Sequence, residues 1–339
     1  MPVKKLEMTV EDAMNLRCVK VLSVAAVAMI ASVTAQAQDY PTKPVTFITP
    51  AAAGNSPDVV TRIVADRLTQ LWKQQIVVLN RPGAGGLIAA QAAAASNIEK
   101  DGYTLYMTQA STYTVLPVMQ EGKMPVDLQK AFTAVGMVGE QPIAVAVNKD
   151  VPANSVKELI ELANKSKDGM LFGATNRGGQ AHLTGELFRE KSKANISFVH
   201  AAGGAVSLND VIAGRIPIMF EGLAGMNPGI QSGGVRLLGI ASQQRLPNLP
   251  NLPAINETVP DVVSSGWIVL MAPTGVPDRV IQKLNADLRQ VVAMKDVQDR
   301  FHQLGTYTRD LTPAQTNEFL RSEEKLWWPI VRQVNQAQK

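Results

Sequence analysis

The stretch Val45–Trp72, VTFITPAAAGNSPDVVTRIVADRLTQLW, decides the predicted fold. It begins with a short apolar run of β type, Val45–Thr49, and continues into a loop of small residues, Pro50–Asn55. We expect a helix next, with Ser56 as its N-cap and Pro57 in its first turn, where the missing N–H costs nothing. Such a unit presents free backbone N–H groups at the positive end of the helix dipole, which suits a carboxylate or a phosphate. An ordinary βα turn that binds nothing shows the same pattern.

Strands and helices alternate over the rest of the chain, which predicts an α/β fold with a parallel sheet and helices on its faces. The first helix carries an apolar stripe of Val59, Val60, Ile63, Val64, Leu68 and Leu71. The further predicted strands are Ile76–Leu79, Tyr103–Thr108, Thr133–Glu140, Ile143–Val147, Met170–Ala174, Ile196–His200, Ile216–Phe220, Leu237–Ala241 and Trp267–Ala272. The further predicted helices are Leu87–Ala95, Ser155–Asn164, a segment carrying Leu183, Leu187 and Phe188, Val206–Ala213, Asp278–Met294, Lys295–Gln303 and Pro313–Asn335.

Two proline-containing segments suggest where the chain passes between domains. Pro142 interrupts two strand-like runs, and we interpret the interruption as a crossing from one domain to the other. The connector Pro247–Pro260 is rich in proline and is expected to be extended rather than helical. Because a strand follows this connector, we expect the chain to return to the first domain there.

The first 37 residues are predicted to be a cleaved signal peptide. Arg17 and Lys20 precede a short apolar run, Leu22–Val33, which leads to a small-residue cleavage site at Ala35-Gln36-Ala37. The run is too short to span a membrane. Met14 is an alternative start of translation, because the residues before it have no such apolar character. We therefore expect a periplasmic protein.

Composition excludes several classes of function. The chain has 339 residues, 46% of them hydrophobic and 18% charged, which is enough for two domains. Its single cysteine, Cys18, lies in the predicted signal peptide, so disulfides, thiol catalysis and thiolate metal sites are excluded from the mature chain. The formal net charge of +4 favours small anions but is too diffuse for nucleic acid.

Enzyme signatures are missing from the sequence. There is no G-x-S-x-G nucleophile elbow and no G-x-x-x-x-G-K phosphate loop. After Gly83–Gly86, Ile88 stands where a dinucleotide fingerprint needs glycine or alanine. The three histidines, His182, His200 and His302, share no short helical spacing that would favour zinc. We therefore expect no catalytic residue, no metal and no cofactor.

Glycine- and hydroxyl-rich loops follow strands in both halves of the chain. The loop Gln109–Thr114 is one of them, and it lies at the carboxyl edge of its strand, where ligands of open α/β sheets collect. Two lobes whose loops present backbone donors form a cleft that can close on a small anion. Closure expels water and strengthens each charge-assisted hydrogen bond.

Several motifs, in order along the mature chain, resemble those of one family, the Bug or TctC extracytoplasmic binding proteins of tripartite tricarboxylate transporters. They are Tyr40–Val45 (YPTKPV), Val78–Gly86 (VLNRPGAGG), Asp101–Leu105 (DGYTL), His182–Phe188 (HLTGELF), Ala213–Ile216 (AGRI), Leu252-Pro253 and Ala272–Pro277 (APTGVP). The resemblance implies a two-lobed α/β periplasmic binding protein of the Venus-flytrap type, each lobe a mostly parallel sheet flanked by helices. We assign residues 38–140 and 261–339 to one lobe and 141–260 to the other.

The resemblance also implies a function. Members of the family capture small organic anions, typically carboxylates, and deliver them to a membrane permease. We therefore expect a monomeric, non-enzymatic binder whose partners are a small carboxylate and membrane permease subunits. Two alternatives stay open: a binder whose closed form docks on a periplasmic sensor, and an exported hydrolase or lyase that uses the same cleft. The second is disfavoured because no nucleophile–base pair is visible.

Carried over position by position, the resemblance implies a set of ligand-binding residues from both lobes. They are Ala53, Gly54, Asn55, Ser56, Asp58, Ala110, Ser111, Thr175, Asn176, Arg177, Gly178, Gly179, Gln180, His182, Gly203, Gly204 and Glu221. The string Asn80–Gly86 looks structural in the family and is not counted. Large side chains usual in the family are missing from Pro50–Asn55 and from His200–Gly204. We hypothesise that their loss enlarges the cleft for a bulkier ligand, such as an aromatic or longer dicarboxylate.

Four of these residues have a plain structural role as an alternative. Arg177 either pairs with a carboxylate or is a solvated loop arginine. Asp58, near the helix start, is more often a partner of the helix dipole, and an orienting role for the loop comes second. His182 is more often capping or packed than a ligand donor. Glu221 would repel a carboxylate, so its expected role is to hold a water, a hydroxyl or a loop amide.

Overall fold

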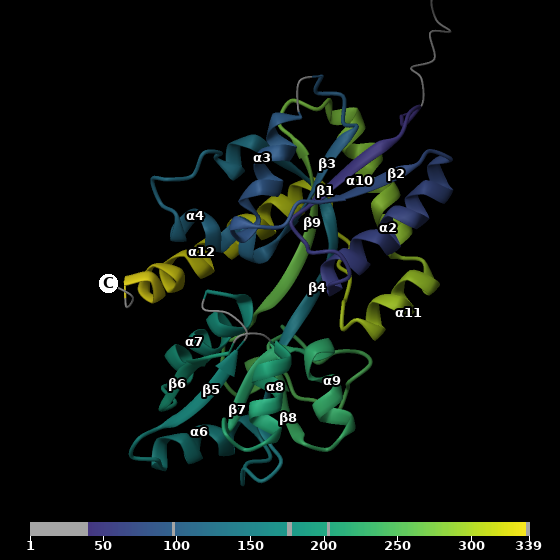
Figure 1. Ribbon diagram of the computed structural model, residues 1–339. Helices are drawn as coiled ribbons and strands as arrows, with labels where there is room; N and C mark the ends of the chain where they lie inside the picture. Colours follow the sequence, from purple (N-terminus) through teal and green to yellow (C-terminus); the bar gives the residue numbers. More distant parts are fainter. Residues whose placement is uncertain (1–39, 97–98, 175–177, 202–203, 337–339) are drawn as a thin grey trace, which may run out of the picture. The chain divides into compact units, whose positions relative to one another are not determined.

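The computed structural model describes residues 40–96, 99–174, 178–201 and 204–336, and the predicted signal peptide lies outside them. The described residues from Lys43 onward form one unit, shown in Figure 1. Its strands are β1 (Val45–Thr49), β2 (Ile76–Asn80), β3 (Thr104–Gln109), β4 (Phe132–Asn148), β5 (Met170–Ala174), β6 (Ile196–His200), β7 (Ile218–Gly222), β8 (Val235–Ile240) and β9 (Ser265–Pro273). Its helices are α2 (Ser56–Trp72), α3 (Leu87–Ala95), α4 (Leu116–Met119), α5 (Leu128–Ala131), α6 (Val156–Lys165), α7 (Gln180–Ser192), α8 (Gly204–Ile212), α9 (Leu223–Gln231), α10 (Asp278–Val292), α11 (Lys295–Gln303) and α12 (Pro313–Gln336). Three short turns of helix, η1 (Ala84–Gly86), η2 (Ser111–Val115) and η3 (Ile255–Glu257), complete the described elements.

The strands form one mixed sheet in the order β2-β1-β3-β9-β4-β7-β5-β6, with β8 also paired to β4. The pairs β1–β2, β1–β3, β5–β6 and β5–β7 are parallel, as the alternation of strands and helices predicts. The pairs that involve β4 or β9 with their neighbours are antiparallel. The two parallel groups are therefore joined by a central antiparallel part.

Strand β4 connects the two parts of the sheet, as Figure 1 shows. It pairs with β9 from Phe132 to Pro142 and with β7 and β8 from Ile143 onward. The prediction of two strands interrupted at Pro142 is wrong, because β4 is continuous. Proline has no N–H to contribute, and Pro142 lies where β4 exchanges one partner for the others. The assignment of residue ranges to two lobes stays a prediction.

Buried side chains form core clusters on both parts of the sheet. One cluster contains Tyr106, Phe132 and Trp267 with the buried alanines of α3. Another contains Phe172 and Phe220 with residues of α6, α7 and the C-terminal part of α12. Because α12 contributes to both clusters, it links the two parts of the sheet.

The predicted N-cap of α2, Ser56, is wrong. The N-cap is Asn55, whose Oδ1 accepts a hydrogen bond of 3.0 Å from the N–H of Asp58. Ser56, the expected cap, is the first residue of the helix, and its hydroxyl accepts from Gln141 Nε2 at 2.6 Å. In the predicted apolar stripe Val60, Ile63, Val64 and Leu68 are buried, whereas Leu71 is 36% exposed.

Three other segments differ from the sequence prediction. β2 is an edge strand with alternate side chains exposed, rather than a buried-type strand. The segment predicted as the loop Gln109–Thr114 contains the end of β3 and the helical turn η2. Helix α9 was not predicted, because Gly225, Pro228 and Gly229 obscure its helical pattern. In the part of the chain that the structure describes, no helix has the length and apolar character needed to cross a bilayer.

Candidate functional site

A cavity of about 580 Å³ lies where the ends of β3 and β7 meet the starts of several helices. Its walls combine residues from both parts of the sheet and include the middle of β4 at Gln141. It is lined by Pro50, Pro57, Gly83, Gly85, Gly86, Gln109, Ala110, Ser111, Thr112, Val115, Leu116, Met119, Gln141, Ile143, Gly178, Gly179, Gln180, Ala181, Glu221, Gly222, Gly266, Trp267 and Ile268. This volume is within the range of about 300–1,000 Å³ that is usual for small-molecule sites.

Helix starts that lack a side-chain cap face this cavity. The N-caps of α3, α7 and α9 are Gly86, Gly179 and Gly222, and in each case no side chain accepts from the first turn. All three glycines line the cavity. The N–H groups of a first turn have no intrahelical partner, and the helix dipole makes this end positive. At α3 the N–H of Leu87 is already bonded to the carbonyl of Ala84 in η1, so the starts of α7 and α9 are the stronger donors. The wall therefore offers backbone donors to an anion.

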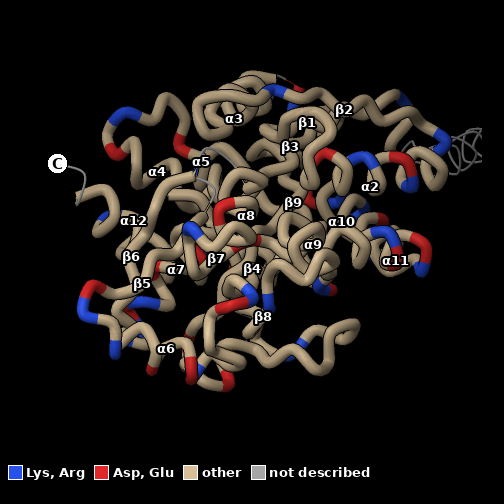
Figure 2. Tube along the Cα trace, turned by 60° about the horizontal axis from the view of Figure 1, so that its bottom comes forward, with Lys and Arg blue, Asp and Glu red and all other residues tan. Residues whose placement is uncertain are grey.

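The charges of the cavity wall are few. Among the described lining residues only Glu221 is charged, and Gln109, Ser111, Thr112, Gln141 and Gln180 supply polar side chains. Figure 2 shows charged residues of both signs along α2, α11 and the region of α6, on the outside of the unit. Attraction of an anion by the described wall thus depends on oriented peptide groups rather than on cationic side chains.

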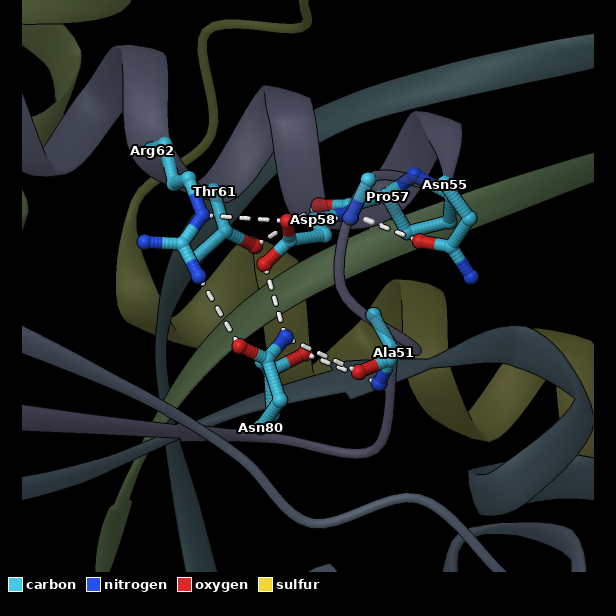
Figure 3. A network of polar contacts seen from close by, with 9 residues as sticks. Ala51, Asn55, Pro57, Asp58, Thr61, Arg62 and Asn80 are labelled. Atoms are coloured by element: carbon cyan, nitrogen blue, oxygen red, sulfur yellow. Dashed lines mark hydrogen bonds and ion pairs between the residues drawn. The ribbon is translucent and has the colours of Figure 1, made fainter.

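Asp58 holds the loop before α2 in place (Figure 3). Its Oδ2 accepts from the N–H of Gly54 at 2.8 Å and from Nε of Arg62 at 3.0 Å, while Oδ1 accepts from Nδ2 of Asn80 at 2.7 Å. Asn80 also donates to the carbonyl of Ala51 at 2.9 Å. Asp58 is only 2% exposed, so this carboxylate orients the loop from behind.

These hydrogen bonds govern the ionisation of Asp58. Burial on its own opposes the charged form, but the donors Arg62, Asn80 and Gly54 outweigh it and lower the pKa of the Asp58 carboxyl below its ordinary value. The residue is therefore a buried, fully hydrogen-bonded anion at neutral pH. Its observed contacts match the orienting role that the sequence analysis placed second.

His182 fixes the loop that leads into α7. Its Nδ1 accepts from the N–H of Gly178 at 2.9 Å, and its ring packs on Phe198 with a centroid separation of 3.9 Å. Its Nε2 lies 3.6 Å from Glu186, and His182 is 1% exposed. Burial opposes ionisation of Glu186, yet the contacts with His182 and Arg189 lower its pKa. The histidine thus has the capping and packing role that the sequence favoured.

A second set of hydrogen bonds ties the first turn of α7 to the segment before β9. Gln180 Nε2 donates to the hydroxyl of Ser264 at 2.9 Å, and that hydroxyl lies 2.6 Å from the hydroxyl of Thr184. Thr184 donates in turn to the carbonyl of Gln180 at 2.7 Å.

At α9, the Oε1 of Glu221 accepts from the N–H of Gly222 at 2.9 Å, which is the loop-amide contact expected for it.

The structure brings together part of the predicted ligand set. The predicted residues that line the cavity are Ala110, Ser111, Gly178, Gly179, Gln180 and Glu221. Those that lie outside its lining are Ala53, Gly54, Asn55, Ser56, Asp58, His182 and Gly204. Thr175, Asn176, Arg177 and Gly203 lie outside the described residues. Ligand contact by any of the set stays a prediction.

Sequence reasoning missed several lining residues, above all the glycine turn Gly83–Gly86. Gly83, Gly85 and Gly86 have φ values of 119°, 66° and 99°, so the turn is built as its glycines suggested. A Cβ on Gly86 would lie 2.1 Å from Oγ1 of Thr112, which means that this turn packs directly on η2. The repeated glycines were the available signal, but they were interpreted as structural only. Gln109 lies in the loop Gln109–Thr114, which the sequence marked, but it was not named as a ligand residue. Gln141 and Trp267 were missed because no local pattern marks them as cavity residues.

No metal centre is visible in the described part of the chain, where no cluster of three His, Cys, Asp or Glu side chains is suitably placed. The described part of the cavity wall presents backbone N–H groups and neutral amide side chains. Its chemistry is suited to holding a ligand.

Comparisons with known proteins identify the family of this chain. Residues 60–336 match the family model described as the tripartite tricarboxylate transporter family receptor, TctC. Protein BugT of Bordetella pertussis is 31% identical over 299 residues, covering 88% of this chain and 91% of BugT. The solved structure of Rpa4515 of Rhodopseudomonas palustris with adipate is 27% identical with a TM-score of 0.71, over 87% of this chain and 98% of that one.

A second solved structure, MatC of Rhodopseudomonas palustris with bound malate, is 25% identical with a TM-score of 0.68. The alignment covers 86% of this chain and 100% of MatC. These likenesses confirm the predicted α/β fold of a periplasmic binding protein. The family model spans most of the chain, and the chain therefore belongs to the TctC, or Bug, family of tripartite tricarboxylate transporter receptors.

Proposed function

We propose that this protein is a periplasmic, non-enzymatic binder that captures a small dicarboxylate and delivers it, as a monomer, to membrane permease subunits of a tripartite transporter. The observation that carries the proposal is the cavity onto which the uncapped starts of α3, α7 and α9 open. Family membership and the adipate and malate bound to two structural neighbours support a carboxylate ligand.

The ligand is held, in this proposal, by peptide groups from opposite walls. The starts of α7 and α9 and the turn η2 supply N–H donors, and Gln109, whose buried Nε2 has no hydrogen-bond partner among the described residues, supplies a neutral amide donor. Hydrogen bonds from backbone N–H groups to an ionised acceptor are stronger than neutral ones, and exclusion of water strengthens them further. Glu221 would repel a carboxylate and already accepts from the N–H of Gly222, the N-cap of α9, so the two acid groups are expected nearer to the start of α7 and to η2.

The size of the cavity supports an aromatic or longer dicarboxylate over a very small acid. Of the loop Pro50–Asn55, Pro50 alone lines the cavity, so no large side chain of this loop occupies it. A volume of about 580 Å³ leaves space for a ligand larger than a four-carbon acid. We therefore expect adipate and aromatic diacids to bind more tightly than malate.

Thermal-shift screening tests this proposal. Malate, adipate, phthalate and terephthalate are titrated against the purified protein, with adipamide as an uncharged control of similar length. A ligand present at 100 times its Kd stabilises the folded protein by about 2.7 kcal/mol. We expect clear stabilisation by at least one diacid and none by adipamide. Stabilisation by none of the acids, or equally by adipamide, would exclude the proposed ligand class.

A further inference from the structure

One carboxyl group, that of the half-buried Glu323, joins the two core clusters. Oε2 of Glu323, on α12, accepts from the indole Nε1 of Trp267 at 2.7 Å and from the indole Nε1 of Trp327 at 3.1 Å. Trp267 belongs to the cluster around β3 and β9, and Trp327 to the cluster around β5 and α7. Glu323 therefore lies where the two clusters meet.

The sequence of α12 places this carboxyl at the junction. Leu320, Glu323 and Trp327 are spaced by three and four residues and so share one face of the helix. Leu320 is buried in the same cluster as Trp267, whereas Trp327 is buried in the other. The helix packs against η2 and α4 as well as against β4 and α7. Movement of one cluster relative to the other would have to change the surroundings of Glu323.

Trp267 connects this junction to the cavity. It lines the cavity together with Gly266 and Ile268, yet only 1% of it is exposed, so it forms part of the wall itself. Its ring packs edge-on against Tyr113 at a centroid separation of 6.1 Å. Tyr113 belongs to η2, whose Ser111 and Thr112 line the cavity. A shift of the Trp267 indole would therefore be transmitted to η2.

The ionisation of Glu323 is consistent with this position. Burial raises the pKa of its carboxyl to about 7, although the two indole hydrogen bonds favour the charged form. The other charged groups that act on it are Glu140 of β4, which raises the pKa, and Arg309, which lowers it. Arg309 and Glu140 form an ion pair of 2.8 Å beside it. Because both indoles donate to the same oxygen, the other oxygen can carry a proton without loss of either hydrogen bond.

We propose that Glu323 is a positioning residue for ligand binding, which holds Trp267 of the cavity wall to the helix that joins the two core clusters. The proposal rests on the proposed function, since it concerns the same cavity. It predicts that an acceptor oxygen at position 323, rather than its negative charge, is what the binding site requires.

Three variants of the secreted protein separate these possibilities. Glu323→Gln keeps an acceptor oxygen and removes the charge. Glu323→Leu keeps the approximate volume and removes the acceptor. Glu318→Gln is the matched control, because Glu318 is an exposed glutamate on the same helix. Circular dichroism confirms that each variant is folded before any other measurement.

The indole N–H signals of protein labelled with ¹⁵N-tryptophan report on the contact directly. Trp267→Phe and Trp327→Phe assign the two signals. In the native protein both are expected to shift with pH around a midpoint of about 7. The shift should disappear in Glu323→Gln, and both signals should move at every pH in Glu323→Leu. Indole N–H signals that do not shift with pH and are unchanged in Glu323→Leu would overturn the proposal.

Calorimetric titration with adipate at pH 6 gives the second readout. We expect Glu323→Leu to bind about tenfold more weakly than the native protein, and Glu323→Gln and Glu318→Gln to stay within about threefold. Equal affinities of Glu323→Leu and the native protein would overturn the positioning role. Should the native protein bind no carboxylate, the proposed function fails, and the indole signals alone then decide whether Glu323 holds Trp267.

Discussion

Replacement of Asp58 by asparagine tests how the loop Pro50–Asn55 is held beside the cavity. The carboxylate accepts three hydrogen bonds, from the N–H of Gly54, from Nε of Arg62 and from Nδ2 of Asn80. Asparagine offers one oxygen and one NH₂ group in the same space. Two of the three donors can keep an acceptor, and the third then faces an NH₂ group.

The neighbours cannot relieve this conflict by turning. Asn80 is held in its orientation because its Oδ1 accepts from Arg62 at 2.8 Å and its Nδ2 also donates to the carbonyl of Ala51. A buried donor without an acceptor costs about 1–3 kcal/mol, and the retained bonds lose their charge assistance. We expect Asp58→Asn to lower the free energy of unfolding by about 3 kcal/mol at pH 7.

Urea denaturation followed by circular dichroism measures this change. Asp66→Asn is the matched control, since Asp66 is an exposed aspartate on the same helix, and its effect should stay below about 0.5 kcal/mol. The pKa of Asp58 is lowered in the folded protein, so its contribution is fully present above the unfolded pKa of about 3.9. It is lost as the pH falls through the folded-state pKa, and the difference between native protein and Asp58→Asn should shrink there. A variant as stable as the native protein at pH 7 would refute the reasoning, and so would a difference that is unchanged at low pH.

Three further pairs of substitutions test the packing of the chain and one helix cap. Gly86→Ala should lower the free energy of unfolding by about 3 kcal/mol and weaken adipate binding, because its Cβ would lie 2.1 Å from Oγ1 of Thr112. Gly54→Ala, also at positive φ but with nothing within 4 Å of the new Cβ, should lower it by about 1 kcal/mol. Urea denaturation of both variants makes the comparison. Ile63→Ala should cost about 3 kcal/mol, as expected for a residue 1% exposed, and Leu71→Ala less than about 1 kcal/mol; similar urea midpoints for the two would contradict the burial pattern of α2. Ser155→Ala should lower the free energy of unfolding by about 1 kcal/mol by removing the N-cap of α6, whereas Ser155→Asp should keep most of that stability. Thermal melts in which both variants unfold at the same temperature as the native protein would exclude a stabilising cap.

Local patterns predicted most of the elements. α6 begins directly after Ser155, where the predicted helix Ser155–Asn164 starts, and the hydroxyl of Ser155 caps it by accepting from the N–H of Glu158. The amphipathic helices α10, α11 and α12 lie within two residues of their predicted bounds, because side-chain periodicity alone specifies them. Such features depend on residues close together in the chain, and the sequence displays them directly.

The features that sequence patterns missed depend on distant contacts. β4 continues through Pro142 because it pairs with β9 up to that residue and with β7 directly after it. Both partner strands lie more than 70 residues further along the chain. The antiparallel direction of β9 likewise follows from the path of the chain after the connector, which no local pattern records. Gln141 lines the cavity because the middle of β4 forms part of the cavity wall. The Nε2 of Gln141 donates to the hydroxyls of Ser56 and Thr306.

The candidate site was partly predictable for the same reason. Gly178–Gln180 lie at the start of α7, and Glu221 lies at the end of β7 before α9; the small residues beside a strand or helix end are a local signal, and these residues do line the cavity. Asp58 and His182 were carried over with them, yet each is buried and holds a ligand loop from behind. A local pattern identifies the loop but does not tell which of its side chains face the cavity.

A crystal structure of the protein with the diacid that stabilises it most tests the central claim, that oriented peptide groups hold the ligand. We expect the diacid in the cavity, with its carboxylate oxygens about 3 Å from backbone N–H groups at the start of α7 or α9 and in η2. A diacid bound elsewhere, or one whose carboxylates contact only cationic side chains, would contradict it.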